Sequence, residues 1–217
     1  MNLKRSLFAA LCLTASAAFA DTWSFETPAL ASGTYDIYGV GGSIDGWTAT
    51  GTTCGTNCIL RLQTNYVEAG GALQFVAQDG AASLDLTGAG NTGQNGITRT
   101  FNLTAGRNYT LSFWIADING ANYAAPSSLT LTVGGSGPMN YTTTTTGGVA
   151  TWTMRSYSFT ATGSTDISFV NMTPVGDNYM GLDNVSLNAV PEPAGIAALS
   201  AGALGLLLST VRRRNRT

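Results

Sequence analysis

The segment YTLSFWIA, residues 109–116, gives the clearest indication of how this chain folds. Apolar and more polar side chains alternate along it, and in an extended strand the two sets point to opposite faces. The apolar set, which we expect in a core, consists of Tyr109, Leu111, Phe113 and Ile115. The segment therefore predicts a half-buried β-strand that carries Trp114 on its other face.

Similar short runs recur on both sides of this segment. They cover residues 22–26, 58–63, 97–103, 128–133, 155–161, 166–170 and 182–187. Residue types that favour strands are abundant, and 27 glycines punctuate the chain, which is the spacing expected of an all-β sandwich. No amphipathic helix is expected between the two ends, and the five threonines 142–146 fit either a strand or a solvated loop.

The first twenty residues have the features of a secretory signal peptide. Lys4 and Arg5 precede an apolar run, and the segment ends on Ala18-Phe19-Ala20, the small-x-small pattern that signal peptidase accepts. The apolar run is too short to cross a hydrocarbon core of about 30 Å. We therefore expect residues 1–20 to be removed and the mature chain to work outside the cytoplasm.

The last 28 residues combine three features in a fixed order. Pro191-Glu192-Pro193 comes first, an uncharged apolar stretch follows at 194–211, and the basic tail 212–217 contains Arg212, Arg213, Arg214 and Arg216. A helix over 194–211 would be about 27 Å long, just enough to span a bilayer, and the arginines would stay on its cytoplasmic side.

This tripartite tail resembles the PEP-CTERM sorting signal. The resemblance implies that an exosortase-type protease recognises Pro191, Glu192 and Pro193 after transient anchoring in the inner membrane. It also implies a Gram-negative bacterium and delivery of the protein to the cell surface or the extracellular matrix. The two prolines fit this role, because they disfavour helix and keep the strip accessible to a protease.

Residues 21–189 remain, a length that fits one domain with one core. Between the two ends, only Arg61, Arg99, Arg107 and Arg155 oppose the twelve carboxylates of the chain. Binding to nucleic acid is therefore not expected, because phosphates require basic patches.

Several short motifs in this central part resemble the galactose-binding-like jelly roll of many carbohydrate-binding modules. They are WSFETP (23–28), IDGW (44–47), DGAASLDLTG (79–88), ITRTFNLTAGRNYTLSFW (97–114) and GLDNVSL (181–187). The resemblance implies a jelly-roll β-sandwich. Arg99 departs from the pattern, because relatives have Gln there, so a ligand contact at this position is not carried over.

Two acidic residues in these motifs are candidate metal ligands. Asp183 shares strand parity with Val185 and Leu187, so its carboxylate should point inward if those two face the core, and a buried charge needs compensation. The resemblance implies a structural calcium ion between Glu26 and Asp183, with backbone carbonyls completing the shell. The alternative is that Asp183 caps turn amides and Glu26 is a solvated strand end.

Cysteine usage agrees with export. Cys12 lies in the signal peptide, which leaves Cys54 and Cys58 of CGTNC as an even pair, and we predict a disulfide between them. A zinc site or a redox pair is the alternative. Zinc sites usually have four ligands, the chain has no histidine, and the spacing is not Cys-x-x-Cys.

Catalysis is not expected. The absence of histidine removes the usual hydrolase triads and most catalytic zinc sites. A pair of carboxylates of the glycosidase type remains as a remote alternative. Its candidates, which lie in turn-like contexts where Asp is common for conformational reasons, are Asp36, Asp45, Asp79 and Asp85.

Binding of a glycan, such as an exopolysaccharide or a cell-envelope glycan, is the leading hypothesis. Sugar rings stack on exposed aromatic rings while nearby polar groups bond their hydroxyls. The candidate platforms are Trp114, Trp152, Tyr123, Tyr66 and Tyr179, whereas Trp23 and Trp47 are expected in the core. The alternative is a purely structural protein of the envelope or biofilm without a defined ligand.

Overall fold

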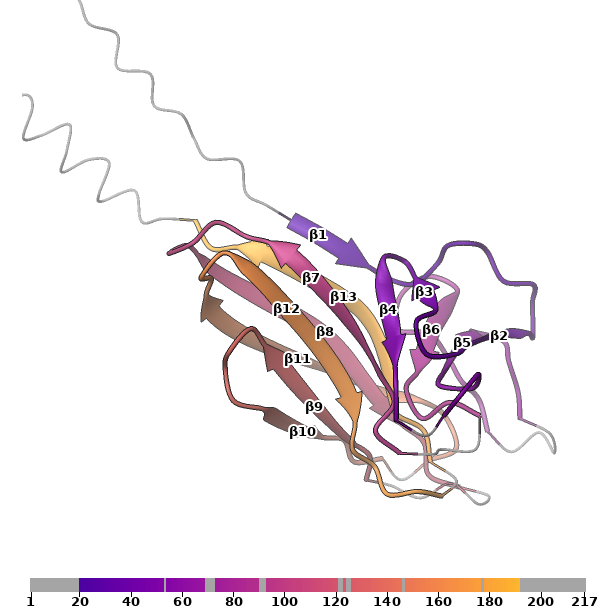
Figure 1. The fold of residues 1–217 in the computed structure, drawn as a ribbon. Helices are drawn as coiled ribbons and strands as arrows, with labels where there is room; N and C mark the ends of the chain where they lie inside the picture. Colours follow the sequence, from indigo (N-terminus) through magenta and orange to yellow (C-terminus); the bar gives the residue numbers. More distant parts are fainter. Residues whose placement is uncertain are drawn as a thin grey trace, which may run out of the picture. The chain divides into compact units, whose positions relative to one another are not determined.

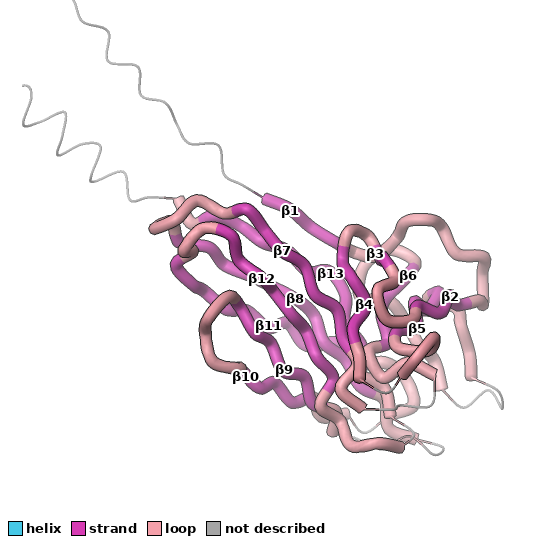
Figure 2. Tube along the Cα trace, in the orientation of Figure 1, coloured by secondary structure: helices cyan, strands magenta, loops and turns pink. Residues whose placement is uncertain are grey.

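A computed structural model of the 217-residue chain describes residues 20–52, 54–68, 73–89, 93–120, 123, 126–145, 147–176 and 178–191. These residues form β-strands, turns and loops and contain no helix, as Figure 2 shows, so the all-β prediction is confirmed. Among them, no helix is long and apolar enough to cross a membrane. The predicted signal peptide up to Phe19 and the predicted tail from Glu192 onward lie outside the described residues.

Residues Ala20–Ala189 form one compact unit of two antiparallel sheets (Figure 1). Sheet A contains β1 (Ala20–Trp23), β2 (Tyr35–Tyr38), β5 (Ile59–Gln63), β6 (Ala82–Asp85), β8 (Asn108–Asp117), β11 (Thr151–Thr160) and β13 (Gly181–Ala189). Its order is β11-β8-β13-β6-β5-β2. β6 pairs with the start of β13 and β1 with its later half.

Sheet B contains β3 (Ser43–Ile44), β4 (Trp47–Thr50), β7 (Gly96–Asn102), β9 (Ser128–Val133), β10 (Met139–Thr142) and β12 (Ser164–Asn171). Its order is β10-β9-β12-β7-β4-β3. From β7 onward the chain crosses repeatedly between the sheets, as the winding of a jelly roll requires. The predicted sandwich is therefore confirmed.

The main core lies between the sheets, where the alternation in β8 predicted it. Tyr109, Leu111, Phe113 and Ile115 are all buried. Trp23 and Trp47 are also buried, as expected, and their rings pack edge to face with centroids 5.7 Å apart. The guanidinium of Arg99 lies 4.8 Å from the centre of the Trp23 ring, so it closes the core with a cation–π contact.

β13 contains an irregularity that reverses its side-chain parity. Its register with β8 shifts between Asp183 and Ser186, and Asn184 has a left-handed φ of 45°. Asp183 pairs with Trp114, on the side of sheet A away from the main core, whereas Leu187 pairs with the core residue Leu111. The expectation that Asp183 faces inward with Leu187 is therefore wrong, because a β-bulge separates the two residues.

The predicted disulfide is confirmed. Cys54 and Cys58 are bonded to each other, and both are buried in the main core cluster next to Ile59 at the start of β5. The short ring holds the turn that leads into this strand.

Candidate functional site

The side of sheet A that is turned away from the main core is the candidate binding surface. We call it the outer face and define it over β1, β8, β11 and β13, whose registers fix which side chains share it. Its members are Thr22, Asn108, Thr110, Ser112, Trp114, Trp152, Met154, Ser156, Ser158, Thr160, Ser186 and Asn188. The alternation of the strands places these side chains opposite to the core set of β8.

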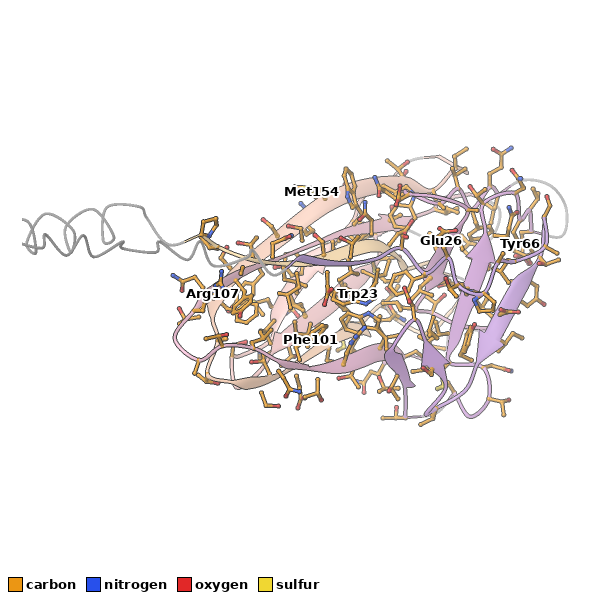
Figure 3. The ribbon with its side chains drawn as sticks, turned by 90° about the horizontal axis from the view of Figure 1, so that it is seen from above. Trp23, Glu26, Tyr66, Phe101, Arg107 and Met154 are labelled. Atoms are coloured by element: carbon orange, nitrogen blue, oxygen red, sulfur yellow. A yellow bond between two sulfur atoms is a disulfide. The ribbon has the colours of Figure 1, made fainter. Side chains whose placement is uncertain are left out.

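An apolar strip, formed by Trp114 and Met154, occupies one end of the outer face. Met154 on β11 pairs with Trp114 on β8, and Trp152 pairs with Ala116. The Met154 side chain is 53% exposed, and Trp114 is half-buried. Figure 3 shows Met154 well away from Trp23, which lies in the interior between the sheets. The strip therefore offers an indole ring and a thioether to a ligand.

Trp152 is more firmly engaged than Trp114. Its indole Nε1 donates a hydrogen bond of 2.7 Å to the carbonyl of Val76, so it ties the segment before β6 to the edge strand β11. Its ring packs, half-buried, against a second apolar cluster, which consists of Leu62, Leu73, Phe75, Ala116, Ile118, Ala150 and Tyr179. Trp152 therefore lies next to the strip and fixes the segment around Val76 to β11.

Hydroxyl and amide groups cover the rest of the outer face. Thr110 and Ser158 share a hydrogen bond of 3.0 Å across β8 and β11, and Thr160 donates one of 2.6 Å to Asn108. The defined members of the face carry no charge, and the nearby carboxylate of Asp183 is fully buried. Such a surface can form hydrogen bonds without favouring ions.

The structure places three other predicted platform residues together, beside the strip. Tyr66, Tyr123 and Tyr179 all pack around Phe75 in the second apolar cluster. Tyr179 is fully buried, so its ring cannot stack on a ligand and its prediction as a surface platform is wrong. Tyr66 is half-buried, and burial together with the neighbouring Glu68 raises the pKa of its hydroxyl to about 12.

Glu26 and Asp183 converge on one turn, formed by residues 78–82. Asp183 Oδ2 accepts hydrogen bonds from the amides of Gln78 (2.9 Å) and Asp79 (3.1 Å). Glu26 Oε1 accepts them from Ala81 and Ala82. The two carboxylates therefore hold opposite ends of the same turn, which is the amide-capping role considered as the alternative for Asp183.

The ionised form of Asp183 is disfavoured at this turn, because the carboxylate is buried and lies near the negative charge of Glu26. Burial, and to a smaller extent the charge of Glu26, raises the pKa of Asp183 to about 7. Within the described ranges, the single ion pair joins Arg61 to Asp36, so no arginine neutralises Asp183. Carboxylate oxygens suit calcium, but the described residues contain no group of three acidic, histidine or cysteine side chains that could hold a metal. Backbone carbonyls would have to supply most of the shell.

The carboxylates considered for catalysis have conformational or structural partners. Asp36 binds Arg61 at 2.7 Å, and buried Asp85 accepts a 2.8 Å bond from the amide of Thr87. Asp45 has a left-handed φ of 49° in the turn between β3 and β4, and Asp79 lies in the 78–82 turn. The predicted turn context is therefore confirmed for Asp45 and Asp79, but it is wrong for Asp36 and Asp85, which lie in strands β2 and β6.

Met154 is not among the platform residues that the sequence predicts. It follows Trp152 by two positions, so the alternation that places Trp152 on a face also places Met154 there. The predicted run began only at Arg155, whereas β11 begins at Thr151. An earlier start of the strand would have identified the residue.

Solved structures with similar folds include proteins of different kinds. A cyclase from Fischerella sp. TAU, solved with 4-(1H-indol-3-yl)butan-2-one, is 18% identical over 78% of this chain and 95% of its own, with a TM-score of 0.53. The K1 cleaved adhesin domain of Lys-gingipain from Porphyromonas gingivalis W83 is 16% identical over 78% and 97%, with a TM-score of 0.48. The module TmCBM61, solved with β-1,4-galactotriose, is 15% identical over 68% and 90%, with a TM-score of 0.43.

At these identities, the likeness to the cyclase establishes a shared fold and no shared activity. No curated protein matches the sequence. Residues 24–188 match the model of a family described as "Protein of unknown function (DUF642)", and because this match spans most of the chain, the protein belongs to that family.

Proposed function

We propose that this protein is a non-catalytic, exported domain that binds a neutral polysaccharide on the outer face of sheet A. The observation that carries the proposal is the composition of this face: an apolar strip of Trp114 and Met154 next to a field of hydroxyls and amides without charge. A pyranose ring has apolar C–H faces and a rim of hydroxyls, and these two features match the two parts of the surface.

The state of the carboxylates supports a binding role over a catalytic one. A glycosidase needs an acid and a second carboxylate beside the same bond. Here Asp36 is held by Arg61, and Asp85 is buried with its carboxylate bonded to Thr87. A carboxylate-dependent glycosidase remains the remote alternative, and turnover of a polysaccharide that is lost in Asp79→Asn would favour it.

Retention on insoluble neutral polysaccharides tests the proposal. The wild-type domain should bind at least one of them, and Trp114→Ala should weaken retention about tenfold. Met172→Ala is the matched control, because Met172 is also an exposed apolar residue but follows β12 in sheet B. Absence of retention on every glycan tested would favour the alternative, a structural protein of the envelope or biofilm.

We also propose that a structural calcium ion binds between Glu26 and Asp183. Support comes from the convergence of the two carboxylates on residues 78–82 and from the absence of a neutralising arginine among the described residues. The ion would supply the missing positive charge and leave the turn in place. Its role is stabilising, since no reaction is assigned to the site.

For delivery, we propose export by signal peptidase cleavage after Ala20, transient anchoring in the inner membrane, and processing near Pro191 by an exosortase-type protease. The Cys54–Cys58 disulfide supports an oxidising compartment, which agrees with the cell surface or extracellular matrix of a Gram-negative bacterium. Mass spectrometry of the protein recovered from the cell surface tests this, because it identifies both ends of the mature chain. Recovery of the full-length chain from the cytosol would contradict the proposal.

A further inference from the structure

A hollow of about 470 Å³ lies at the end of the sandwich opposite to the loops that hold the second apolar cluster. It opens between the sheets, and of its lining residues only Thr160 is also a member of the outer face. Its lining residues are Val133, Gly134, Gly135, Ser136, Tyr157, Phe159, Thr160, Thr162 and Thr165. The volume is within the range of small-molecule sites.

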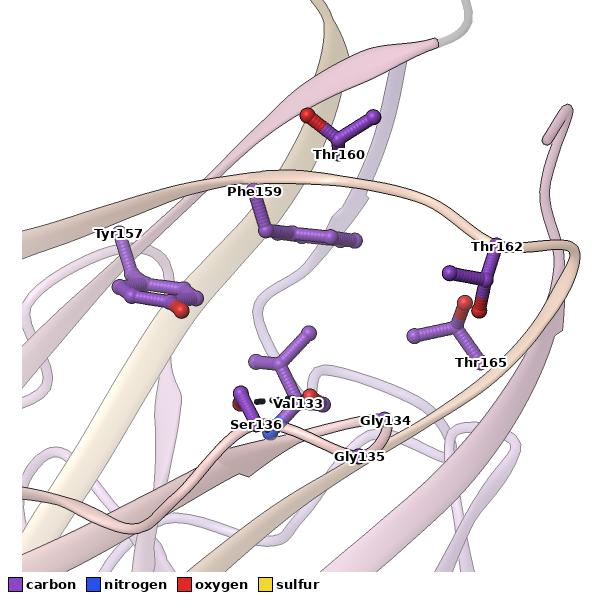
Figure 4. Close-up of a pocket in the computed structure, with 9 residues that line it drawn as sticks. All are labelled: Val133, Gly134, Gly135, Ser136, Tyr157, Phe159, Thr160, Thr162 and Thr165. Atoms are coloured by element: carbon purple, nitrogen blue, oxygen red, sulfur yellow. Dashed lines mark hydrogen bonds between the residues drawn. The ribbon is translucent and has the colours of Figure 1, made fainter. Parts of the chain in front are cut away.

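Two aromatic rings form one flat wall of this hollow. Tyr157 and Phe159 project from the inner side of β11, where they pair with Leu111 and Tyr109. Their rings are almost parallel, with an interplanar angle of 13° and centroids 6.1 Å apart. Figure 4 shows both rings edge-on and side by side, opposite Val133 and the turn that follows it.

The wall is accessible because of the sheet topology. β11 is the last strand of sheet A and β10 the last strand of sheet B, so no further strand covers the inner face of β11 on this side. Tyr157 and Phe159 therefore remain half-buried, whereas Tyr109, one strand further in, is buried. Phe159 stacks on Tyr109 with centroids 6.0 Å apart, which fixes the orientation of the wall.

The rim of the hollow carries hydroxyl groups and no charged side chain. Thr165 donates its hydroxyl hydrogen to the carbonyl of Gly163, and Ser136 donates to the carbonyl of Val133. Because a hydroxyl has one hydrogen and two lone pairs, both oxygens can still accept a hydrogen bond from a ligand. The rim therefore suits a ligand that donates through hydroxyls, and it gives no advantage to an anion.

We propose that this hollow is a second binding site, which takes one neutral pyranose unit. A flat aromatic wall matches the C–H face of the sugar, and the threonine rim matches its hydroxyls. The inference rests on the proposed function for the class of ligand, a neutral sugar. The site itself is independent, since none of the residues that line the hollow belongs to the apolar strip. Two separate sites on one domain would allow it to bridge neighbouring glycan chains.

An NMR titration with methyl β-glucoside, methyl β-galactoside, methyl β-glucuronide and benzyl alcohol tests the proposal. At least one neutral glycoside should shift the amides of Gly134, Gly135 and Ser136, while the Trp114 indole signal stays in place. Tyr157→Ala should weaken this binding roughly three- to tenfold, and Ser158→Ala, whose side chain lies on the outer face, should leave it unchanged.

Gly135→Val gives a second variant that leaves the aromatic wall intact. Gly135 lines the hollow, and a Cβ at this position meets no atom within 4 Å, so a larger side chain can be introduced there without a clash at the Cβ. Saturable shifts that both variants weaken would support the site. Shifts with benzyl alcohol alone, preference for the glucuronide, or no shifts with any probe would overturn it.

The two proposals fail separately. If glycosides shift the Gly134 amide signal but Trp114→Ala leaves retention on polysaccharide unchanged, the outer-face site is refuted and the site in the hollow is supported. If Trp114→Ala abolishes retention and no glycoside shifts the Gly134 amide signal, the outer-face site is supported and the site in the hollow is refuted.

Discussion

Met154 and Trp114 are cross-strand partners at the edge of sheet A, and both side chains lie on its outer face. The pairing joins an exposed thioether to a half-buried indole, so the two form one apolar surface at the border of a polar sheet. Residues directly opposite on antiparallel strands have Cβ atoms about 5 Å apart, close enough for one sugar ring to contact both.

This pairing predicts a graded loss of polysaccharide binding. Trp114→Ala should weaken affinity about tenfold, and Met154→Ala by less, because the thioether supplies a smaller contact area than the indole. Since the outer face carries no charge, affinity should change little between low and high salt. Affinity gel electrophoresis at two salt concentrations measures both effects, and a steep fall with salt would contradict an uncharged site.

The buried Asp85 predicts a pH dependence of stability. Burial raises the pKa of its carboxyl from 3.8 to about 7. The folded protein therefore holds this proton more tightly than the unfolded chain, so the carboxyl's contribution to stability is complete below pH 3.8 and declines as the pH rises to about 7. The loss is on the order of 4 kcal/mol, since one pKa unit corresponds to about 1.4 kcal/mol.

Asp85→Asn isolates this contribution. The substitution removes the ionisation but keeps an oxygen that can accept the 2.8 Å bond from the Thr87 amide. Urea unfolding between pH 4 and 8, in the presence of a chelator, should show a smaller decline for the variant than for the wild type. Asp166→Asn, an exposed carboxylate on β12, is the control, and equal declines for all three proteins would refute the effect.

Much of the fold could be predicted from the sequence, because the longer strands bury one face and expose the other. β9 matches its predicted bounds, and the predicted core set of β8 is buried. Short strands such as β2 and β6 were missed, because four residues are too few to show a period of two. All four residues of β6 are buried, so it shows no alternation at all.

The candidate site was less predictable, because it depends on relations between distant segments. The bulge at Asn184 put Asp183 on the outer side of the sheet, and strict parity could not foresee this. Asn184, which follows Asp183, could indicate the bulge, because Asn tolerates the left-handed conformation better than most residues. Tyr179 is buried by loops that return from other parts of the chain, which a single strand pattern cannot reveal.

Calcium should stabilise the domain if Glu26 and Asp183 hold it. Millimolar calcium should raise the melting temperature of the wild type, by the equivalent of about 2.7 kcal/mol at one hundred times the dissociation constant. The effect should grow between pH 5 and 8, because the raised pKa of Asp183, about 7, makes the ion compete with a proton at lower pH.

Two variants and one control define the calcium site. Glu26→Gln and Asp183→Asn should both abolish the calcium response, whereas Asp166→Asn should retain it. Differential scanning calorimetry with and without a chelator gives the comparison. A wild-type melting temperature that does not respond to calcium would leave the two carboxylates with their amide-capping role alone.

The Cys54–Cys58 disulfide should stiffen one turn without holding the whole domain together. Closing so short a ring contributes about 2 kcal/mol in the loop-entropy account, because few conformations of the unfolded chain are removed. Replacing both cysteines by alanine should therefore lower the melting temperature by roughly 4–8 °C and leave a cooperative transition. The outer face lies on strands other than β5, into which the turn leads, so retention on polysaccharide should persist. Loss of cooperative unfolding in the double variant would show instead that the β-sandwich depends on this bond.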